Sequence, residues 1–474
     1  MFPKVSKITE IRQNTSTAYL IENPNQIVDE RLTQADKEYI SFRLEKDGDC
    51  TIQKWPHLLY FKKIEKHKDK YLGFEAARIA GAKVIGELKI SKIEQIQLIN
   101  LCTENYTAAF LEGLLLSTYN FDKYLKEKET FHLKEVFIQD KISDPEIEEL
   151  LALAEAVFAA RNLVNEPVSY LTAPRFSEEI EKLGEQAGFS VEVFNKRKIE
   201  SLKMGGLLAV NRGSIDPPTF NILEWKPQNA KNKQPIVLVG KGIVFDTGGL
   251  SLKPTANSMD YMKTDMAGGA VVASTIFAIA KNKLPVHVVG LVPATDNRPD
   301  GNAYVPGDVI TMFDGTTVEV RNTDAEGRLI LADALSYAKK YKPMLVIDYA
   351  TLTGAADMIA GAYASVVMGN APEHLENLKS IGFETFERII EVPLWEEYAK
   401  ALKSNIADLN NLGVREAQST IAGKFLEHFT DYKWIHIDSA GMSYLKEADA
   451  YRPAGATGSG TRLLYHFIKA SFCR

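Results

Sequence analysis

The sequence predicts an α/β protein of two domains, a smaller N-terminal α/β domain and a larger C-terminal domain. Its 474 residues are too many for one ordinary hydrophobic core. With 45% hydrophobic and 25% charged residues, the composition is that of a soluble globular protein. In the second part of the chain, short apolar runs alternate with amphipathic stretches, which predicts a mainly parallel or mixed sheet covered by helices.

Residues 1–140 are predicted to form the N-terminal α/β domain. The stretches "TAYLIE" and "EYISFRL" have the composition of strands. Asp47 and Gly48 indicate a hairpin turn after the second of them.

A connecting helix is predicted over residues 141–168. Ser143 or Asp144 can cap its first turn, and Pro145 suits the first helical position. Pro167 ends the apolar pattern of this helix, so the chain enters the second domain there.

Residues 169–474 are predicted to form the larger domain. Its helices are predicted at 267–281 and 329–340. Ligands are expected beyond the carboxyl ends of the strands, as in other parallel sheets. The predicted buried strands are 235–240, 286–292, 344–350, 365–370 and 434–441.

Net charge and cysteine content indicate the cellular compartment of the protein and the classes of partner that it lacks. A net charge of -6 gives no general attraction to nucleic acid or to an anionic membrane. Three cysteines, Cys50, Cys102 and Cys473, are too few for a disulfide framework and favour a reducing compartment. No signal peptide is evident, and no segment approaches 18 uninterrupted apolar residues. These features predict a cytoplasmic protein without a membrane or nucleic-acid partner.

One acidic motif, "RNTDAEGRLILADALSYAKK", stands where a helix begins. Asp324 and Glu326 are favoured near a helix N-terminus, so capping or a surface ion pair is one explanation for them. Arg328 does not fit that explanation, because a cation near the positive end of the helix dipole costs roughly 0.3 to 1 kcal/mol. The alternative is a functional site in which an anion compensates Arg328.

A second motif, "GKGIVFDTGGLSLKPTANSMDYMKTDMAGGA", follows the strand predicted at 235–240. It can be plain turn chemistry, and it lacks the spacing of a phosphate-binding loop. The two motifs together bring four carboxylates to strand ends, where they would repel one another unless cations were present. Two divalent ions would balance the charges of Asp246, Asp265, Asp324 and Glu326, as in two-metal hydrolases.

The metal would be bound mainly by oxygen, because none of the eight histidines lies in either motif. Such a site accepts Mn²⁺ or Mg²⁺ as well as Zn²⁺. The same carboxylates could also serve a Mg²⁺-dependent phosphoryl-transfer enzyme, and this alternative stays open at the level of the motifs.

With both motifs considered, the chain resembles the cytosolic leucyl aminopeptidases, a family of two-zinc homohexamers. "NTDAEGRL" from Asn322 is that family's signature, and the second motif closely resembles its other catalytic segment. Further matches are "ARNLVNEP" from Ala160, "MGGLLAVNRGS" from Met204, "ATLTGA" from Ala350 and "HIDSAG" from His436. The resemblance extends from about residue 108 to the C-terminus.

The resemblance implies a role for each residue of the motifs. Lys253 would stabilise the oxyanion, and Arg328 would hold a bicarbonate that acts as general base. Lys241 must be neutral to bind a metal, so the ion must displace its proton. The tighter metal would be bound by Lys241, Asp246, Asp265 and Glu326. The exchangeable metal would be bound by Asp246, Asp324 and Glu326. The pocket for the substrate side chain would include Met262, Thr351, Gly354, Ala440 and Ser443.

The resemblance also implies an activity. The enzyme would hydrolyse the N-terminal residue of peptides with a free N-terminus, with broad specificity for apolar residues such as leucine. A water bridging two metal ions would attack the first peptide bond. Zinc would be the main metal, with manganese or magnesium possible at the exchangeable site. Some members of the family also act as DNA-binding architectural proteins, an alternative against which the net charge of -6 argues.

Overall fold

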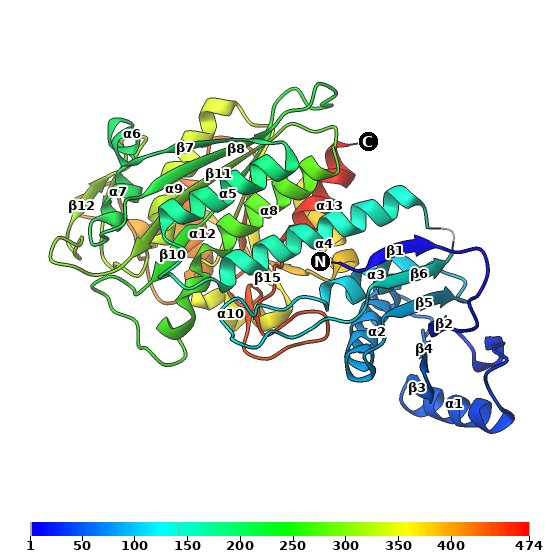
Figure 1. The fold of residues 1–474 in the computed structure, drawn as a ribbon. Coiled ribbons are helices and arrows are strands. Elements are labelled where there is room, and N and C mark those ends of the chain that lie inside the picture. The colour runs from blue at the N-terminus through cyan, green and yellow to red at the C-terminus, as the bar shows by residue number, and fades with distance from the viewer. Residues whose placement is uncertain (1, 141, 474) are drawn as a thin grey trace. The chain divides into compact units, whose positions relative to one another are not determined.

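The computed structural model describes residues 2–140 and 142–473. It has the predicted mixed α/β class. The chain passes from one compact unit to the next within helix α4 (Asp144–Asn165), the long cyan helix of Figure 1. This helix lies within the range 141–168 predicted for a connecting helix, of which residue 141 is outside the described residues. The two units are Met1–Glu155 with Glu447–Pro453, and Ala156–Lys446 with Ala454–Arg474.

The first unit is built on a six-stranded sheet of order β1-β6-β5-β2-β4-β3. All neighbours in this sheet are parallel except β3 and β4, which form a hairpin. Its strands are β1 (Lys4–Lys7), β2 (Ser16–Ile21), β3 (Asp49–Lys54), β4 (His57–Lys63), β5 (Gln95–Asn100) and β6 (Glu135–Gln139). Its helices are α1 (Gln34–Lys46), α2 (Lys70–Ser91) and α3 (Thr107–Leu116).

Two predictions for this unit are wrong. The stretch "EYISFRL" lies in helix α1 rather than in a strand, and Thr33 and Asp36 begin that helix with a reciprocal capping box. Gly48, with φ of +73°, joins α1 to β3, so the turn at Asp47 and Gly48 does not join two strands.

The second unit is built on a nine-stranded sheet of order β16-β15-β18-β14-β9-β11-β8-β7, with β10 paired to β11. The central strands β18, β14, β9 and β11 are parallel and buried on both faces, which explains why they read as continuous apolar runs. The outer strands β7, β8 and β15 make antiparallel pairs. The strands are β7 (Ser190–Phe194), β8 (Thr219–Trp225), β9 (Ile236–Gly240), β10 (Gly242–Asp246), β11 (Val288–Asn297), β14 (Leu345–Ala350), β15 (Ser365–Gly369), β16 (Ile389–Glu391) and β18 (Trp434–Asp438).

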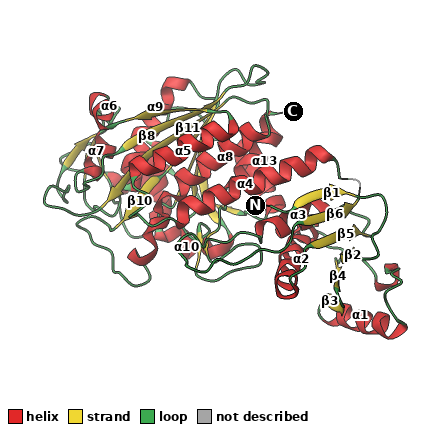
Figure 2. Ribbon diagram, viewed as in Figure 1, coloured by secondary structure: helices red, strands yellow, loops and turns green. Residues whose placement is uncertain are grey.

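Helices cover both faces of this sheet (Figure 2). On one face α8 (Ala267–Lys281) packs on the central strands beside α5 (Ala173–Ala187) and α13 (Thr461–Phe472). On the other, α9 (Gly327–Ala338) shares a hydrophobic core with Val237 and Val239 of β9. The remaining helices are α6 (Lys196–Ser201), α7 (Gly205–Asn211), α10 (Gly354–Ala360), α11 (Pro372–Thr385) and α12 (Gln418–Glu427). The short strands are β12 (Val309–Thr311), β13 (Thr317–Glu319), β17 (Leu409–Asn410), β19 (Tyr444–Leu445) and β20 (Gly455–Ala456).

The strands predicted in this unit are confirmed as β9, β11, β14, β15 and β18. Helix α8 has the predicted bounds, and α9 begins two residues before its predicted start. Across the described ranges of the chain, no helix combines the length and apolar character needed to cross a bilayer.

Candidate active site

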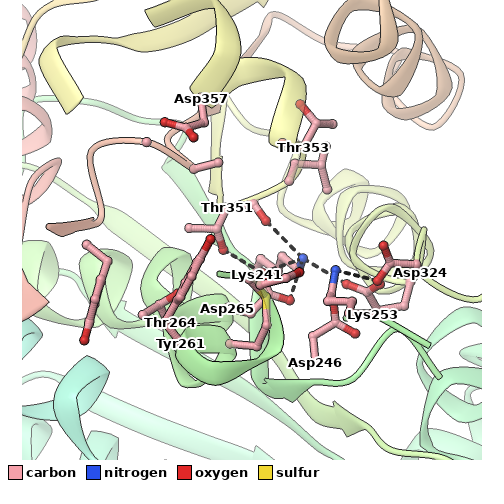
Figure 3. Close-up of a pocket in the computed structure, with 18 of the residues that line it drawn as sticks. Lys241, Asp246, Lys253, Tyr261, Thr264, Asp265, Asp324, Thr351, Thr353 and Asp357 are labelled. Carbon is pink, nitrogen blue, oxygen red and sulfur yellow. Dashed lines mark hydrogen bonds and ion pairs between the residues drawn. The ribbon is translucent and has the colours of Figure 1, made fainter. Parts of the chain in front are cut away.

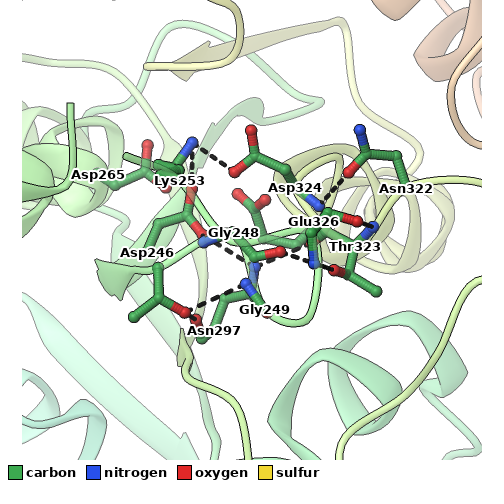
Figure 4. Close-up of polar contacts among 12 residues, drawn as sticks. Asp246, Gly248, Gly249, Lys253, Asp265, Asn297, Asn322, Thr323, Asp324 and Glu326 are labelled. Carbon is green, nitrogen blue, oxygen red and sulfur yellow. Dashed lines mark hydrogen bonds and ion pairs between the residues drawn. The ribbon is translucent and has the colours of Figure 1, made fainter. Parts of the chain in front are cut away.

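Three buried carboxylates meet at the carboxyl edge of the larger sheet. Asp246, Asp265 and Glu326 each offer an oxygen, and these oxygens lie within 4.8 Å of one another (Figure 4). All three side chains are buried, so their charges are poorly solvated. Such a group needs positive charge close by.

Each carboxylate reaches this point for a local reason. Asp246 is the last residue of β10, and Gly248 and Gly249, with φ of +85° and +61°, turn the chain directly after it. Asp265 lies in a 3-10 segment, Met259–Met266, that leads into α8. Glu326 stands at the N-cap position of α9, yet its side chain makes no capping hydrogen bond. Capping therefore does not explain Glu326, whose carboxylate faces Lys241 instead.

Lys241 lies between two of these carboxylates. Its Nζ is 2.8 Å from Asp265 and 2.9 Å from Glu326 Oε1, and it also donates to the carbonyl of Thr351 at 3.1 Å (Figure 3). A Cβ on Gly327 would lie 2.5 Å from Lys241 Cε. A side chain at position 327 would therefore force the lysine side chain to shift from its place beside the start of α9.

Lys253 joins the fourth carboxylate to the cluster. Its Nζ is 2.9 Å from Asp246 Oδ2 and 2.5 Å from Asp324 Oδ1. The Asp324 side chain is 32% exposed, which makes it the most solvated carboxylate of the four. The structure thus brings Lys241, Lys253 and all four predicted carboxylates into one site.

The charges of the site act strongly on one another. Burial, with added repulsion from Glu326 and Asp246, raises the pKa of Asp324 to about 7. Burial likewise raises the pKa of Asp265 well above its usual range. The pKa of Lys241 is raised because Asp265, Glu326 and Asp246 outweigh the effect of its own burial. Two lysine side chains thus face four carboxyl groups, an excess of acidic groups that further cations would relieve.

Arg328 is the second residue of α9 and is only 3% exposed. Its Nη1 donates to the carbonyl of Leu412 at 3.5 Å, and its Nε has no hydrogen-bond partner among the described residues. Burial lowers the pKa of Arg328 to about 10, opposed by attraction to Glu326 and Asp438. A buried guanidinium with unused donors can bind an anion.

A cavity of about 580 Å³ adjoins the carboxylate cluster and Arg328. Four of the predicted pocket residues line it: Met262, Thr351, Gly354 and Ala440. Ser443 is not among the residues that line it. This residue is buried, and its hydroxyl is hydrogen-bonded to the carbonyl and the hydroxyl of Ser439. The prediction that Ser443 lines the pocket is corrected accordingly.

Several residues of the cavity wall were not predicted from the sequence. Tyr261 and Tyr444 stack at 6.0 Å on its wall, and Asp357 lies three residues after Gly354 on α10 (Figure 3). Gly354 and Asp357 are three residues apart on α10 and share one helix face, a spacing that could have indicated Asp357. The two tyrosines are brought together by segments far apart in the chain.

The donor set fits divalent metal ions. Glu326 Oε2 is buried and has no hydrogen-bond partner in the part of the chain that the structure describes. Carboxylate oxygens are good ligands for Mg²⁺ and Mn²⁺ and also bind Zn²⁺. An α/β domain with such a cluster at the carboxyl ends of its strands, beside a cavity, has the architecture of a metal-dependent hydrolase.

Comparison with known proteins defines the class further. The chain belongs to the cytosol aminopeptidase family, and residues 158–465 match its catalytic domain. It is 46% identical to a probable cytosol aminopeptidase of Chlorobium limicola over 379 residues, 76% of this chain and 75% of that protein. It is 41% identical to one of Chloroherpeton thalassium over 430 residues, 86% of this chain and 81% of that protein. The protein is thus a metal-dependent aminopeptidase, a hydrolase of the exopeptidase class.

A solved structure has a similar fold. The bottromycin maturation enzyme BotP in complex with Mn is 29% identical, with a TM-score of 0.85. The match covers 96% of this chain and 99% of that one. The same enzyme described without Mn matches with a TM-score of 0.84.

Proposed function

We propose that the protein removes the N-terminal residue from peptides with a free N-terminus, by a two-metal mechanism with a preference for apolar residues. The observation that carries this proposal is the meeting of Asp246, Asp265 and Glu326 within 4.8 Å at the wall of a cavity. That cavity is also lined by Met262 and Ala440, whose apolar side chains suit an apolar substrate side chain.

The cluster would hold two ions with different donor sets. Zinc is the proposed metal of the tighter site, and manganese or magnesium is possible at the exchangeable one. When bound, such ions supply Lewis acidity and lower the pKa of a nucleophilic water. The tighter site is assigned to Lys241, Asp246, Asp265 and Glu326. The exchangeable site is assigned to Asp246, Asp324 and Glu326.

The remaining roles fall to charged side chains of the chain itself. Lys253 keeps its proton, because the pKa of Lys253 is raised by Asp246, Glu326 and Asp324 against the effect of burial. Its ammonium group is therefore available to donate to the oxyanion that develops on the peptide carbonyl. Arg328 is assigned a bicarbonate anion, which would accept and return protons as a general base.

The proposal is tested with leucine p-nitroanilide and its N-acetylated form. We expect hydrolysis of the free substrate, loss of activity after chelation, and recovery on adding Zn²⁺ or Mn²⁺. The acetylated substrate should resist cleavage because its α-nitrogen can no longer act as a free amine. Equal cleavage of both substrates would contradict the proposal, as would turnover of phosphoesters with none of the free substrate.

Removal of the Arg328 charge should separate its role from that of the metals. The change Arg328→Met removes the charge and keeps an unbranched side chain. We expect unchanged or slightly higher thermal stability, because burial disfavours the charged form of Arg328. Activity should fall only partly, within the roughly 10² to 10⁴ that a general base contributes. In bicarbonate-depleted buffer, added bicarbonate should stimulate the wild-type enzyme and not the variant. Equal stimulation of both proteins would show that Arg328 does not bind the bicarbonate.

Assembly and location are part of the same proposal. The family resemblance of the sequence supports a homohexamer, and large apolar side chains such as Met358, Tyr363 and Trp395 are exposed on the single chain. The names of the relatives, which include the word cytosol, support a cytoplasmic location. Light scattering of the purified protein tests the hexamer directly.

A further inference from the structure

Two halves of the site come from distant segments, and one buried amide connects them. The first half, Asp246 and Lys253, follows β10, while the second, Asp324 and Glu326, precedes α9. Asn297, the last residue of β11, lies between these halves and is 1% exposed. It belongs to neither motif of the sequence.

The amide of Asn297 uses both hydrogens of its nitrogen at this junction. Nδ2 donates to Asp246 Oδ1 at 2.8 Å and to the carbonyl of Thr323 at 2.9 Å (Figure 4). A carboxylate oxygen and a backbone carbonyl both need a donor, and neither an ionised aspartate nor a leucine could supply one at this position. The backbone carbonyl of Asn297 also accepts from the Thr247 hydroxyl at 2.7 Å, which fixes the residue after Asp246.

The hydrogen bond from Asn297 Nδ2 to Asp246 Oδ1 helps to decide which oxygen of Asp246 faces the site. Oδ1 accepts from Asn297 and from the backbone N–H of Gly248 at 2.8 Å. Oδ2 is left to face Lys253 Nζ at 2.9 Å. The carboxylate therefore cannot rotate without losing two hydrogen bonds in a buried place, where each unmade bond costs about 1 to 3 kcal/mol.

Thr323 completes the connection from the other side. Its hydroxyl donates to the carbonyl of Gly248 at 2.6 Å and accepts from the N–H of Ser251 at 2.8 Å. Its carbonyl accepts from Asn297 and also from the Tyr304 hydroxyl at 2.7 Å. Thr323 is fully buried and directly precedes Asp324.

We propose that Asn297 and Thr323 are positioning residues that hold the two halves of the metal site in the correct relative position before an ion binds. The inference rests on the metal site of the proposed function and adds residues that touch no metal ion. Hydrogen bonds of this kind orient metal ligands, and their loss typically weakens metal affinity 10- to 100-fold. The consequence is a site whose affinity depends on a strand, β11, that supplies no ligand.

The test compares Mn²⁺ affinity of wild type and of Asn297→Leu, measured by electron paramagnetic resonance of free Mn²⁺. The matched control is Asn221→Leu, because Asn221 is equally buried on β8 and donates to the Val292 carbonyl at 3.0 Å. We expect roughly 10- to 100-fold weaker binding in Asn297→Leu. Affinity per folded Asn221→Leu molecule should stay at the wild-type value. Melting of the metal-free proteins gives the folded fraction of each.

Each outcome distinguishes a positioning role of Asn297 from a merely structural one. Equal loss of affinity in both asparagine variants would assign Asn297 a merely structural role and overturn the inference, as would unchanged affinity in Asn297→Leu. If Asn297→Leu does not fold, Thr323→Val, which keeps its shape, takes its place with the same expected loss. Wild type that binds no Mn²⁺ and cleaves no leucine substrate would overturn the proposed function itself. Mn²⁺ binding alike in wild type and all variants would overturn only the inference.

Discussion

Replacing Asp246 or Glu326 by alanine should abolish peptide hydrolysis and lower the metal content from about two ions per chain. Each of these residues is assigned to both ions, so its loss removes a ligand from each site at once. Both residues are 2% exposed, and alanine offers no oxygen in place of the lost carboxylate. Elemental analysis of dialysed protein, together with initial rates on leucine p-nitroanilide, measures both effects.

The control for this experiment is Asp333→Asn. Asp333 is buried on the same helix α9, and its carboxylate accepts the N–H groups of Leu207 and Phe313, away from the cluster. Burial raises the pKa of Asp333 to about 7, against the lowering effect of the backbone N–H groups that it accepts. Its metal content and activity should stay near wild type. Full metal occupancy in both Asp246→Ala and Glu326→Ala would contradict their assignment to both ions.

Lys253→Ala should lower kcat by roughly 10² to 10³, as expected for loss of one oxyanion donor. Metal content should remain unchanged, because Lys253 is assigned to the substrate and not to an ion. Removing its charge also removes a competitor for Asp246 and Asp324, so metal affinity should not fall. Steady-state kinetics and elemental analysis on the same preparation separate the two effects.

A matched control for Lys253 lies nearby. Lys263 donates from Nζ to the carbonyl of Asn165 at 2.6 Å and does not line the cavity. Lys263→Ala should therefore leave kcat within about the wild-type range. Loss of metal from Lys253→Ala would instead identify Lys253 as a metal ligand.

Strands buried on both faces were the easiest elements to predict. The central strands of the larger sheet read as continuous apolar runs, since helices cover them from both sides. "EYISFRL" was misread because Ile40, Phe42 and Leu44 alternate as in a strand. The structure buries only Ile40 and Leu44, four residues apart in α1, and leaves Phe42 59% exposed. So short a stretch fits both the two-residue period of a strand and the roughly four-residue period of a helix. Tertiary packing decides between them.

The candidate site was predictable where its residues lie in short contiguous motifs, and not elsewhere. Asp246 and Glu326 each stand beside glycines that identify their loops. Asn297 acts on partners 51 and 26 residues away, a relation that no local pattern records. Ser443 matched its expected position in the sequence, but its hydroxyl is engaged by Ser439 inside the protein.

The two lysines of the site have a consequence for how the protein matures. Lys241 and Lys253 already place ammonium groups against the carboxylates. We therefore expect a newly synthesised chain to complete its fold before it binds metal. Maturation then separates into folding first and metal loading afterwards, and a chelated enzyme should be recoverable without refolding. Lys241, as a proposed ligand, would have to release a proton before its nitrogen binds an ion, so we expect metal loading to weaken as the medium is acidified. The supply of metal, rather than the folding reaction, would then determine which ion the mature enzyme carries.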